Sequence, residues 1–277
     1  MKPLYPSSAP QGKQIFFASD LHAGAPSRAE SRPREKHFIR WLERCAPDAG
    51  AFYLIGDLWD FWFEYQEVVP KGYVRLLGAL AAIIDAGIPI FFQSGNHDLW
   101  LTGYLTEEIG MQQLDDPYLA EWQGYSFFIS HGHKIGPIRW IDRFLYMLME
   151  NLWLQRLYRC LHPDIGLRLG RFFSGRSRVA HSPMDDVDLG EKEYTRQFVH
   201  AQQRYRPTDW YIFGHRHLAL SEVIGRSRLI LLGDWIRRYT FLCLREDSWG
   251  LYAFQSDQTL IPLAVGDTLA PVPRGTS

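Results

Sequence analysis

Five short motifs carry side chains of the types that bind metal ions, and each motif follows an apolar run of strand length. The motifs are Asp20-x-His22, Gly56-Asp57, Asn96-His97-Asp98, His131-x-His133 and His215-x-His217. Carboxylate and amide oxygens combined with imidazole nitrogens suit Mn²⁺, Fe²⁺ or Zn²⁺, and the lack of cysteine among them argues against a structural zinc site. These residue types therefore predict a site for divalent metal ions.

Each motif alone has an ordinary structural explanation. An Asp after a strand commonly caps a turn, and a histidine on an apolar strand is commonly a hydrogen-bonded core residue. Five such motifs in order, each after an apolar run, are hard to explain as turns. Because ligands of open α/β sheets gather at the carboxyl ends of the strands, residues as far apart as Asp20 and His217 can converge there.

The elements that must position these motifs alternate between strand and helix. Apolar runs rich in Ile, Phe and Tyr predict strands buried on both faces, over residues 15–20, 51–57, 88–96, 126–132, 210–215 and 228–234. Helical patterns cover about 34–46 and about 70–86. The alternation predicts an α/β domain with a layered sheet. The strands from 228 onward lack intervening helices, which predicts an antiparallel part.

Residues 137–205 break this alternation and contain no convincing strand. They predict two or three helices with apolar residues on more than one face. We interpret this segment as a helical insertion into a main domain formed by residues 1–136 and 206–277. The alternative is that its apolar stripe simply packs on the main domain, as most such stripes do.

The motif series as a whole resembles that of the calcineurin-like metallophosphoesterases, and every element of the pattern is present. The resemblance implies a four-layer αββα sandwich that holds two divalent metal ions. It assigns Asp20, His22 and His217 to one ion and Asn96, His131 and His215 to the other. Asp57 would bridge the two ions, and His97 would lie near the leaving group.

A pair of divalent ions in such a site can activate a water and stabilise the attacking and leaving oxygens of a displacement at phosphorus. The resemblance favours Mn²⁺, with Fe²⁺, Zn²⁺ and Mg²⁺ as alternatives. Imidazole ligands need an outer partner, and Asp98 beside His97 is a candidate for that role. The equal alternative is that Asp98 caps the next turn.

Within that family, the chain is most similar to the UDP-2,3-diacylglucosamine diphosphatases of lipid A biosynthesis. The similarity runs from FFASDLH to LLGDW and includes the insertion, with NLWLQ at 151–155 and the basic-Ser-basic run at 176–178. It implies hydrolysis of the substrate to UMP and 2,3-diacylglucosamine 1-phosphate, with the insertion as a lid that receives acyl chains. The expected substrate contacts are Asn96, His97, Arg176, Ser177, Arg178, His181 and His215. The Arg-Gly that follows the second motif in protein phosphatases is missing here.

Two positions depart from the best-known members of this group. His97 stands where they have Arg, and His133 stands where they have Asp. Both positions belong to the expected active site, so recognition of the pyrophosphate is left open. A divergent branch of the same enzyme and a related lipid-phosphate hydrolase both fit. A nucleotide or cyclic-nucleotide phosphodiesterase would leave the aromatic insertion unexplained, and a lipid-binding scaffold without catalysis would be expected to lack metal ligands.

The net charge of −1 averages two unlike parts of the chain. Residues 134–180 hold nine basic and three acidic residues, so this segment is +6 and the remainder is −7. An apolar and basic helical segment is typical of proteins at anionic lipid surfaces, which predicts transient docking on the inner membrane. No long basic surface interleaved with aromatic residues is visible outside this segment, so we expect no nucleic-acid partner. The N-terminus has no apolar signal segment, so we expect a cytoplasmic location. The oligomeric state is left open.

Overall fold

The computed structural model describes residues 1–4, 12–136, 140, 144, 147–149, 151–181, 187–205 and 207–271, and for residues 176–181 it describes only the backbone. The strands are β1 Lys2–Pro3, β2 Gln14–Ala18, β3 Ala49–Ile55, β4 Ile90–Gln93, β5 Gln112–Gln113, β6 Tyr118–Trp122, β7 Tyr125–Ser130, β8 Trp210–Phe213, β9 Ala219–Ile224, β10 Ser227–Leu232, β11 Thr240–Leu244, β12 Trp249–Phe254 and β13 Leu260–Gly266. The helices are α1 Arg28–Cys45, α2 Val74–Asp85, α3 Tyr104–Glu107, α5 Leu152–Arg159, α6 Pro163–His181 and α7 Tyr194–Tyr205, with 3₁₀ turns at η1 Ala46–Asp48 and η2 Gly190–Lys192.

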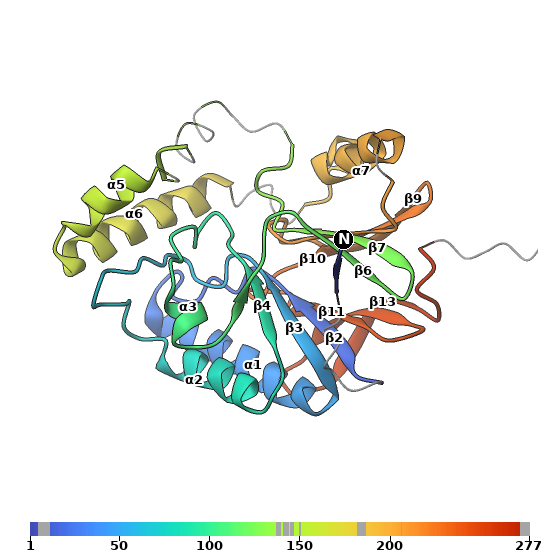
Figure 1. Cartoon of the computed structure of the whole chain (residues 1–277), viewed down its shortest axis with the longest axis horizontal. Coiled ribbons are helices and arrows are strands. Elements are labelled where there is room, and N and C mark those ends of the chain that lie inside the picture. The colour runs from blue at the N-terminus through green and yellow to red at the C-terminus, as the bar shows by residue number, and fades with distance from the viewer. Residues whose placement is uncertain are drawn as a thin grey trace, which may run out of the picture.

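The strands form two sheets that pack face to face between layers of helices (Figure 1). The seven-stranded sheet has the order β13-β12-β11-β2-β3-β4-β5, and the six-stranded sheet has the order β1-β6-β7-β8-β10-β9. Helices α1 and α2 cover the outer face of the first sheet, and α7 covers the second. The expected four-layer α/β sandwich is therefore confirmed.

Burial on both faces explains the composition of the central strands. Every residue of β3, β8 and β11 is buried. The two inner faces meet in one apolar cluster that includes Phe17, Tyr53 and Trp210. Strands β2, β3 and β4 are mutually parallel, whereas β11 is antiparallel to both β2 and β12, so the predicted antiparallel part is also present.

Helix α1 begins earlier than the sequence indicated. Its N-terminus is capped by Ser27, whose hydroxyl accepts a hydrogen bond from the backbone N–H of Glu30. Pro33 lies inside the helix, one turn after the start, although the pattern predicted a start beyond it. The Ser27–Glu30 pair has the sequence of a capping box, and this local signal fixes the start in spite of the proline.

The described part of residues 137–205 is helical and contains no strand, as expected. Helices α5 and α6 pack against each other, and α7 instead contacts β9 and β10 of the six-stranded sheet. The α5–α6 pair rests on an apolar cluster centred on Phe61, Phe63 and Leu167. Within the part of the chain that the structure describes, we find no helix with the length and apolar character needed to cross a membrane.

Candidate metal centre

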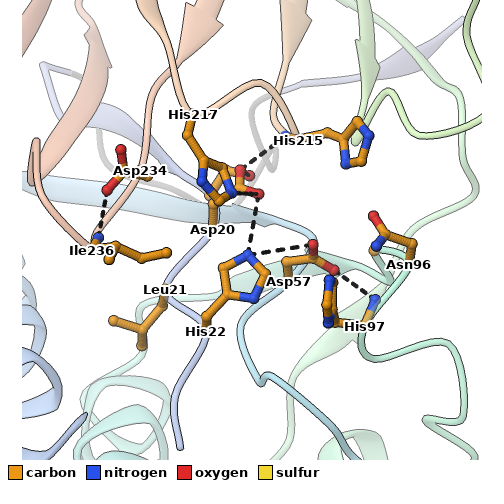
Figure 2. A network of polar contacts seen from close by, with 12 residues as sticks. Asp20, Leu21, His22, Asp57, Asn96, His97, His215, His217, Asp234 and Ile236 are labelled. Carbon is orange, nitrogen blue, oxygen red and sulfur yellow. Dashed lines mark hydrogen bonds and ion pairs between the residues drawn. The ribbon is translucent and has the colours of Figure 1, made fainter. Parts of the chain in front are cut away.

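The predicted metal-binding side chains lie on loops that leave the carboxyl ends of five strands. Asp20 and His22 follow β2, Asp57 follows β3, and Asn96 follows β4 of the seven-stranded sheet. The histidines of the last two motifs follow β7 and β8 of the six-stranded sheet; they are His131, His215 and His217. Figure 2 shows the loops from both sheets facing one another across a small space. Residues that are distant in sequence therefore meet at one end of the sandwich.

Two groups of ligand atoms form around Asp57. In the first, Asp20, His22 and His217 place their ligand atoms within 4.8 Å of one another, with His217 Nε2 3.4 Å from Asp20 Oδ1. In the second, Asp57, His131 and His215 do the same. Asp57 Oδ2 lies 3.6 Å from His22 Nε2 and 3.4 Å from His131 Nε2, so this carboxylate lies between the groups.

Asn96 lies at the edge of the second group. Its Oδ1 is 3.3 Å from His131 Nε2. The other ring nitrogen of His131, Nδ1, donates a hydrogen bond to the carbonyl of Ile55 at 2.9 Å, because a carbonyl can only accept. This bond leaves Nε2 as the nitrogen available to a metal ion. The structure thus brings all seven predicted metal ligands together.

The carboxylate oxygens and imidazole nitrogens of the site are suited to binding cations. Among the residues that the structure describes, Asp20 Oδ1 and both ring nitrogens of His22 are buried without a hydrogen-bond partner, which is the state expected of atoms that ligate metal ions. Burial opposes the charged form of His22, but contacts with Asp20, Asp60 and Asp57 outweigh burial and raise its pKa to about 10. For His131 burial is likewise outweighed, chiefly by Asp57, and its pKa is raised to about 10. The buried carboxylates therefore stabilise positive charge strongly.

The backbone around the site is held in conformations that few residues adopt. Asp20, His22, Asp57 and His215 all have positive φ, between 46° and 62°. Such φ values cost free energy in non-glycine residues and are found at functional sites. Gly95 allows the next loop to approach, because a Cβ there would lie 2.1 Å from Asp57 Oδ1.

Two arginines that sequence reasoning missed hold the ligand loops from outside. Arg34 of α1 donates through Nε to the carbonyl of Leu21 at 2.9 Å and through Nη2 to that of His22 at 2.7 Å. Arg238 donates through Nε to the carbonyl of His217 at 2.8 Å. Their sequence positions carry no signal of this role, because each reaches the loop only through the tertiary fold.

Asp98 serves the backbone of the centre. Its carboxylate accepts hydrogen bonds from the backbone N–H groups of Gly95 at 2.6 Å and Leu58 at 2.9 Å. It also accepts from the N–H groups of Asp57 and Trp59, the residues on either side of Leu58. These bonds reach back to Gly95 and across to the loop after β3, so they match neither the expected partner of an imidazole nor a cap on the next turn. Asp98 joins the loop after β4 to the loop after β3.

His97, the residue before Asp98, makes contacts through both its backbone and its ring. Its backbone N–H donates to Asp57 Oδ1 at 2.9 Å (Figure 2). Its Nδ1 lies 3.1 Å from the carbonyl oxygen of Asp60 and 2.8 Å from the hydroxyl of Ser174 on α6. His22, Asp60 and His97 form a third cluster of potential ligand atoms. The GD-x-x-D spacing from Asp57 could have identified Asp60, but nothing in the sequence singled out Ser174.

His133 occupies a buried position beside the second group. The centroid of its ring is 5.4 Å from that of His131 and 6.3 Å from that of His215. Burial and then the charge of His131 lower the pKa of His133 well below its usual value, so the ring is neutral. Its Nδ1 lies 4.0 Å from Asp116 Oδ2.

The other expected substrate contacts lie on α6. Arg176, Ser177, Arg178 and His181 belong to its last turns, and their side chains lie outside the described part of the chain. Arg171 lies earlier on the same helix. Burial and the charge of Arg28 lower the pKa of Arg171, so the two positive charges repel each other.

A sandwich that presents two neighbouring carboxylate–imidazole groups at the ends of its strands is the architecture of a metal-dependent phosphoesterase. The profile of the calcineurin-like phosphoesterase family matches residues 13–219. The chain belongs to this family and is a metal-dependent hydrolase.

Comparison with individual proteins is more specific than the match to the family. The chain is 36% identical over 240 residues to a UDP-2,3-diacylglucosamine hydrolase of Porphyromonas gingivalis, covering 81% of this chain and 91% of that protein. It is 27% identical over 254 residues to the UDP-2,3-diacylglucosamine hydrolase of Haemophilus influenzae, covering 88% of this chain and 100% of that protein. Among solved structures, a phosphoesterase from E. coli matches with a TM-score of 0.46 and 15% identity, over 92% of this chain and 99% of that one.

Proposed function

We propose that this protein hydrolyses the pyrophosphate bond of UDP-2,3-diacylglucosamine to UMP and 2,3-diacylglucosamine 1-phosphate, a step of lipid A biosynthesis. The observation that carries the proposal is the metal centre with an aromatic, apolar pair of helices docked directly beside it. His97 of the centre contacts Ser174 of α6 at 2.8 Å, so a substrate bound at the metals also meets this helix. The two relatives named above carry that activity in their names.

The metal ligands follow the two groups. Asp20, His22 and His217 would hold one divalent ion, and Asn96, His131 and His215 the other, with Asp57 shared between them. When bound, the pair of ions activates a water and stabilises negative charge on the phosphate oxygens, and Mn²⁺ is the metal we propose. The chain's own residues fix the geometry: Ile55 sets the tautomer of His131, and Asp57 accepts the N–H of His97. This places the His97 ring beside the centre, where we assign it to the leaving group.

We assign the lid to the part of the insertion that contains α5 and α6. Helix α7 lies on the six-stranded sheet and belongs to the outer layer of the sandwich. On the lid we propose Arg176, Ser177, Arg178 and His181 as contacts to the sugar and phosphates, in addition to Asn96, His97 and His215 at the centre. The Arg28–Arg171 pair supports an anionic substrate, because a bound phosphate would relieve the repulsion between two guanidinium groups.

Exposed apolar residues on the lid and in the segment before it support docking on the cytoplasmic face of the inner membrane. These large apolar side chains are exposed rather than packed, namely Trp140, Phe144, Met147, Leu152, Trp153, Leu157, Ile165, Phe172 and Phe173. Large exposed apolar side chains accompanied by basic residues are typical of membrane-contacting proteins. Arg156 lies over the ring of Trp153 at 5.1 Å, which places a cation beside one of these side chains.

Product analysis tests the proposal. The full-length protein is incubated with Mn²⁺ and UDP-2,3-diacylglucosamine, and in parallel with bis-p-nitrophenyl phosphate. We expect UMP and 2,3-diacylglucosamine 1-phosphate from the lipid, at a kcat/KM far above that for the aryl diester. Hydrolysis of the aryl diester without release of UMP would instead indicate a phosphoesterase with another lipid phosphate or nucleotide as substrate.

A further inference from the structure

Three small residues on one face of α6 bring the lid helix against the loop after β3. Gly166, Gly170 and Ser174 are four positions apart, so they share one face of the helix. A Cβ at Gly166 would lie 2.0 Å from Tyr65 Oη, and one at Gly170 would lie 2.1 Å from the ring of Phe61. The helix therefore docks through its backbone at these two points. The third position faces the metal centre.

Ser174 is the point where the docked helix contacts the reactive loop. Its side chain is only 8% exposed. Its hydroxyl donates a hydrogen bond to the carbonyl of Asp60 at 2.6 Å and lies 2.8 Å from Nδ1 of His97. Because the hydroxyl proton is used by that carbonyl, the oxygen presents a lone pair to the ring.

The contacts of His97 Nδ1 determine where the ring carries its proton. The carbonyl oxygen of Asp60, 3.1 Å from Nδ1, can only accept a hydrogen bond. The Ser174 oxygen must also act as an acceptor, because its own proton is donated to that carbonyl. Nδ1 is therefore the protonated nitrogen, and Nε2 is the one left for the substrate. Ser174 is the closer of the two acceptors and the only one of them that comes from the lid.

We propose that Ser174 is a positioning residue that orients His97 and thereby links docking of the lid to catalysis. The inference rests on the role assigned to His97 in the proposed function. With α6 in place, the ring is fixed by two acceptors from two different elements. If α6 moved away, Nδ1 would lose its closest contact and keep those to Asp60, whose carbonyl oxygen lies at 3.1 Å and whose Oδ1 lies at 3.9 Å. Turnover is therefore expected to be fastest when the lid is docked.

A double-mutant comparison tests this link. Ser174→Ala should lower kcat about 10-fold and change KM less than twofold, because general acid–base groups contribute 10²- to 10⁴-fold and only their orientation is disturbed. Ser174→Thr, which keeps the hydroxyl, should restore most of the loss. In a His97→Ala background, Ser174→Ala should cause no further loss. Tyr158→Phe is the matched control, because it removes another hydroxyl bond of the lid, to Gly166 at 2.6 Å, without contact to His97.

The outcomes separate the inference from its alternatives. Equal losses from Ser174→Ala in both backgrounds, a change confined to KM, or the same loss in Tyr158→Phe would show that Ser174 only supports the lid. All variants are also assayed with bis-p-nitrophenyl phosphate, so the comparison holds even if no UMP is released from the lipid. NMR spectra of the unaltered protein labelled with ¹⁵N-histidine give a check that does not depend on any variant folding correctly. The resonances assigned to His97 should show the Nδ1–H tautomer, and an Nε2–H tautomer would overturn the proposal.

Discussion

Asp57 is the side chain on which the two groups of metal-binding residues converge, since it lies 3.6 Å from His22 and 3.4 Å from His131. Asp57→Ala should reduce turnover at least 10³-fold and lower the bound metal, because it removes the ligand that we propose both ions share. His97→Ala should slow turnover by about 10²-fold with normal metal content. Turnover and elemental analysis of the same preparations check both. Mn²⁺-dependent activity in Asp57→Ala would contradict the shared-ligand assignment.

The raised pKa values of two histidines lead to a pH dependence of metal binding. In the metal-free protein, His22 and His131 have pKa values raised to about 10, so both rings are protonated at pH 8. A metal ion needs the neutral ring, and its binding must release these protons. We expect about two protons to be released when both proposed sites fill, and tighter binding as pH rises from 6 to 9. Calorimetry in buffers of different ionisation enthalpy measures the number.

The residues that could be predicted are those whose role follows from local sequence. The position of a side chain directly after an apolar strand can be predicted because the strand itself specifies where that side chain will lie, as for Asp20 and Asp57. Arg34 and Ser174 act on the same loops from helices elsewhere in the chain. Their contacts depend on how helices pack, which local sequence does not encode.

Helix α6 offers a test of how closely the lid must approach the loop after β3. Gly170→Ala places a methyl group against the buried ring of Phe61, so docking of the helix should weaken by about 1–3 kcal/mol. Turnover of the lipid substrate should fall severalfold, and trypsin should cleave at Arg168 and Arg171 more rapidly. The matched control is Gly78→Ala on α2, where a Cβ meets nothing within 4 Å. That change should stabilise the protein by up to about 1 kcal/mol, through helix propensity alone. Unchanged cleavage in Gly170→Ala would contradict close docking.

The strands that sequence analysis missed are mostly edge or hairpin strands. Strand β13 contains Pro262, which argues against a central strand, and it is tolerated because β13 is at the edge of its sheet. Strand β6 pairs with β7 through a turn at Gln123-Gly124, where both residues have positive φ. Gln-Gly is not among the dipeptides that strongly predict a hairpin, so the sequence did not indicate this turn. The central strands were predictable because burial on both faces produces continuous apolar runs.

The uneven distribution of charge and apolar surface over the molecule leads to a prediction about membranes. Replacing Trp153 and Leu157 together by Glu should abolish co-sedimentation with anionic vesicles at modest salt, because both side chains are exposed on the lid. Val74→Glu is the control, since Val74 is equally exposed but belongs to α2 on the far side of the seven-stranded sheet. Equal binding by all three proteins, or no binding by the unaltered one, would rule out docking through the lid.

The ligand loops come from both sheets, and this has a consequence for the integrity of the sandwich. Each proposed ion would take ligands from the seven-stranded sheet and from the six-stranded sheet, as His217 joins Asp20 and His22, and His215 joins Asp57. The ions would therefore act as cross-links between the halves of the fold, and an ion at a hundred times its Kd adds about 2.7 kcal/mol to stability. Metal supply would then govern how long each molecule survives in the cell, besides how fast it works.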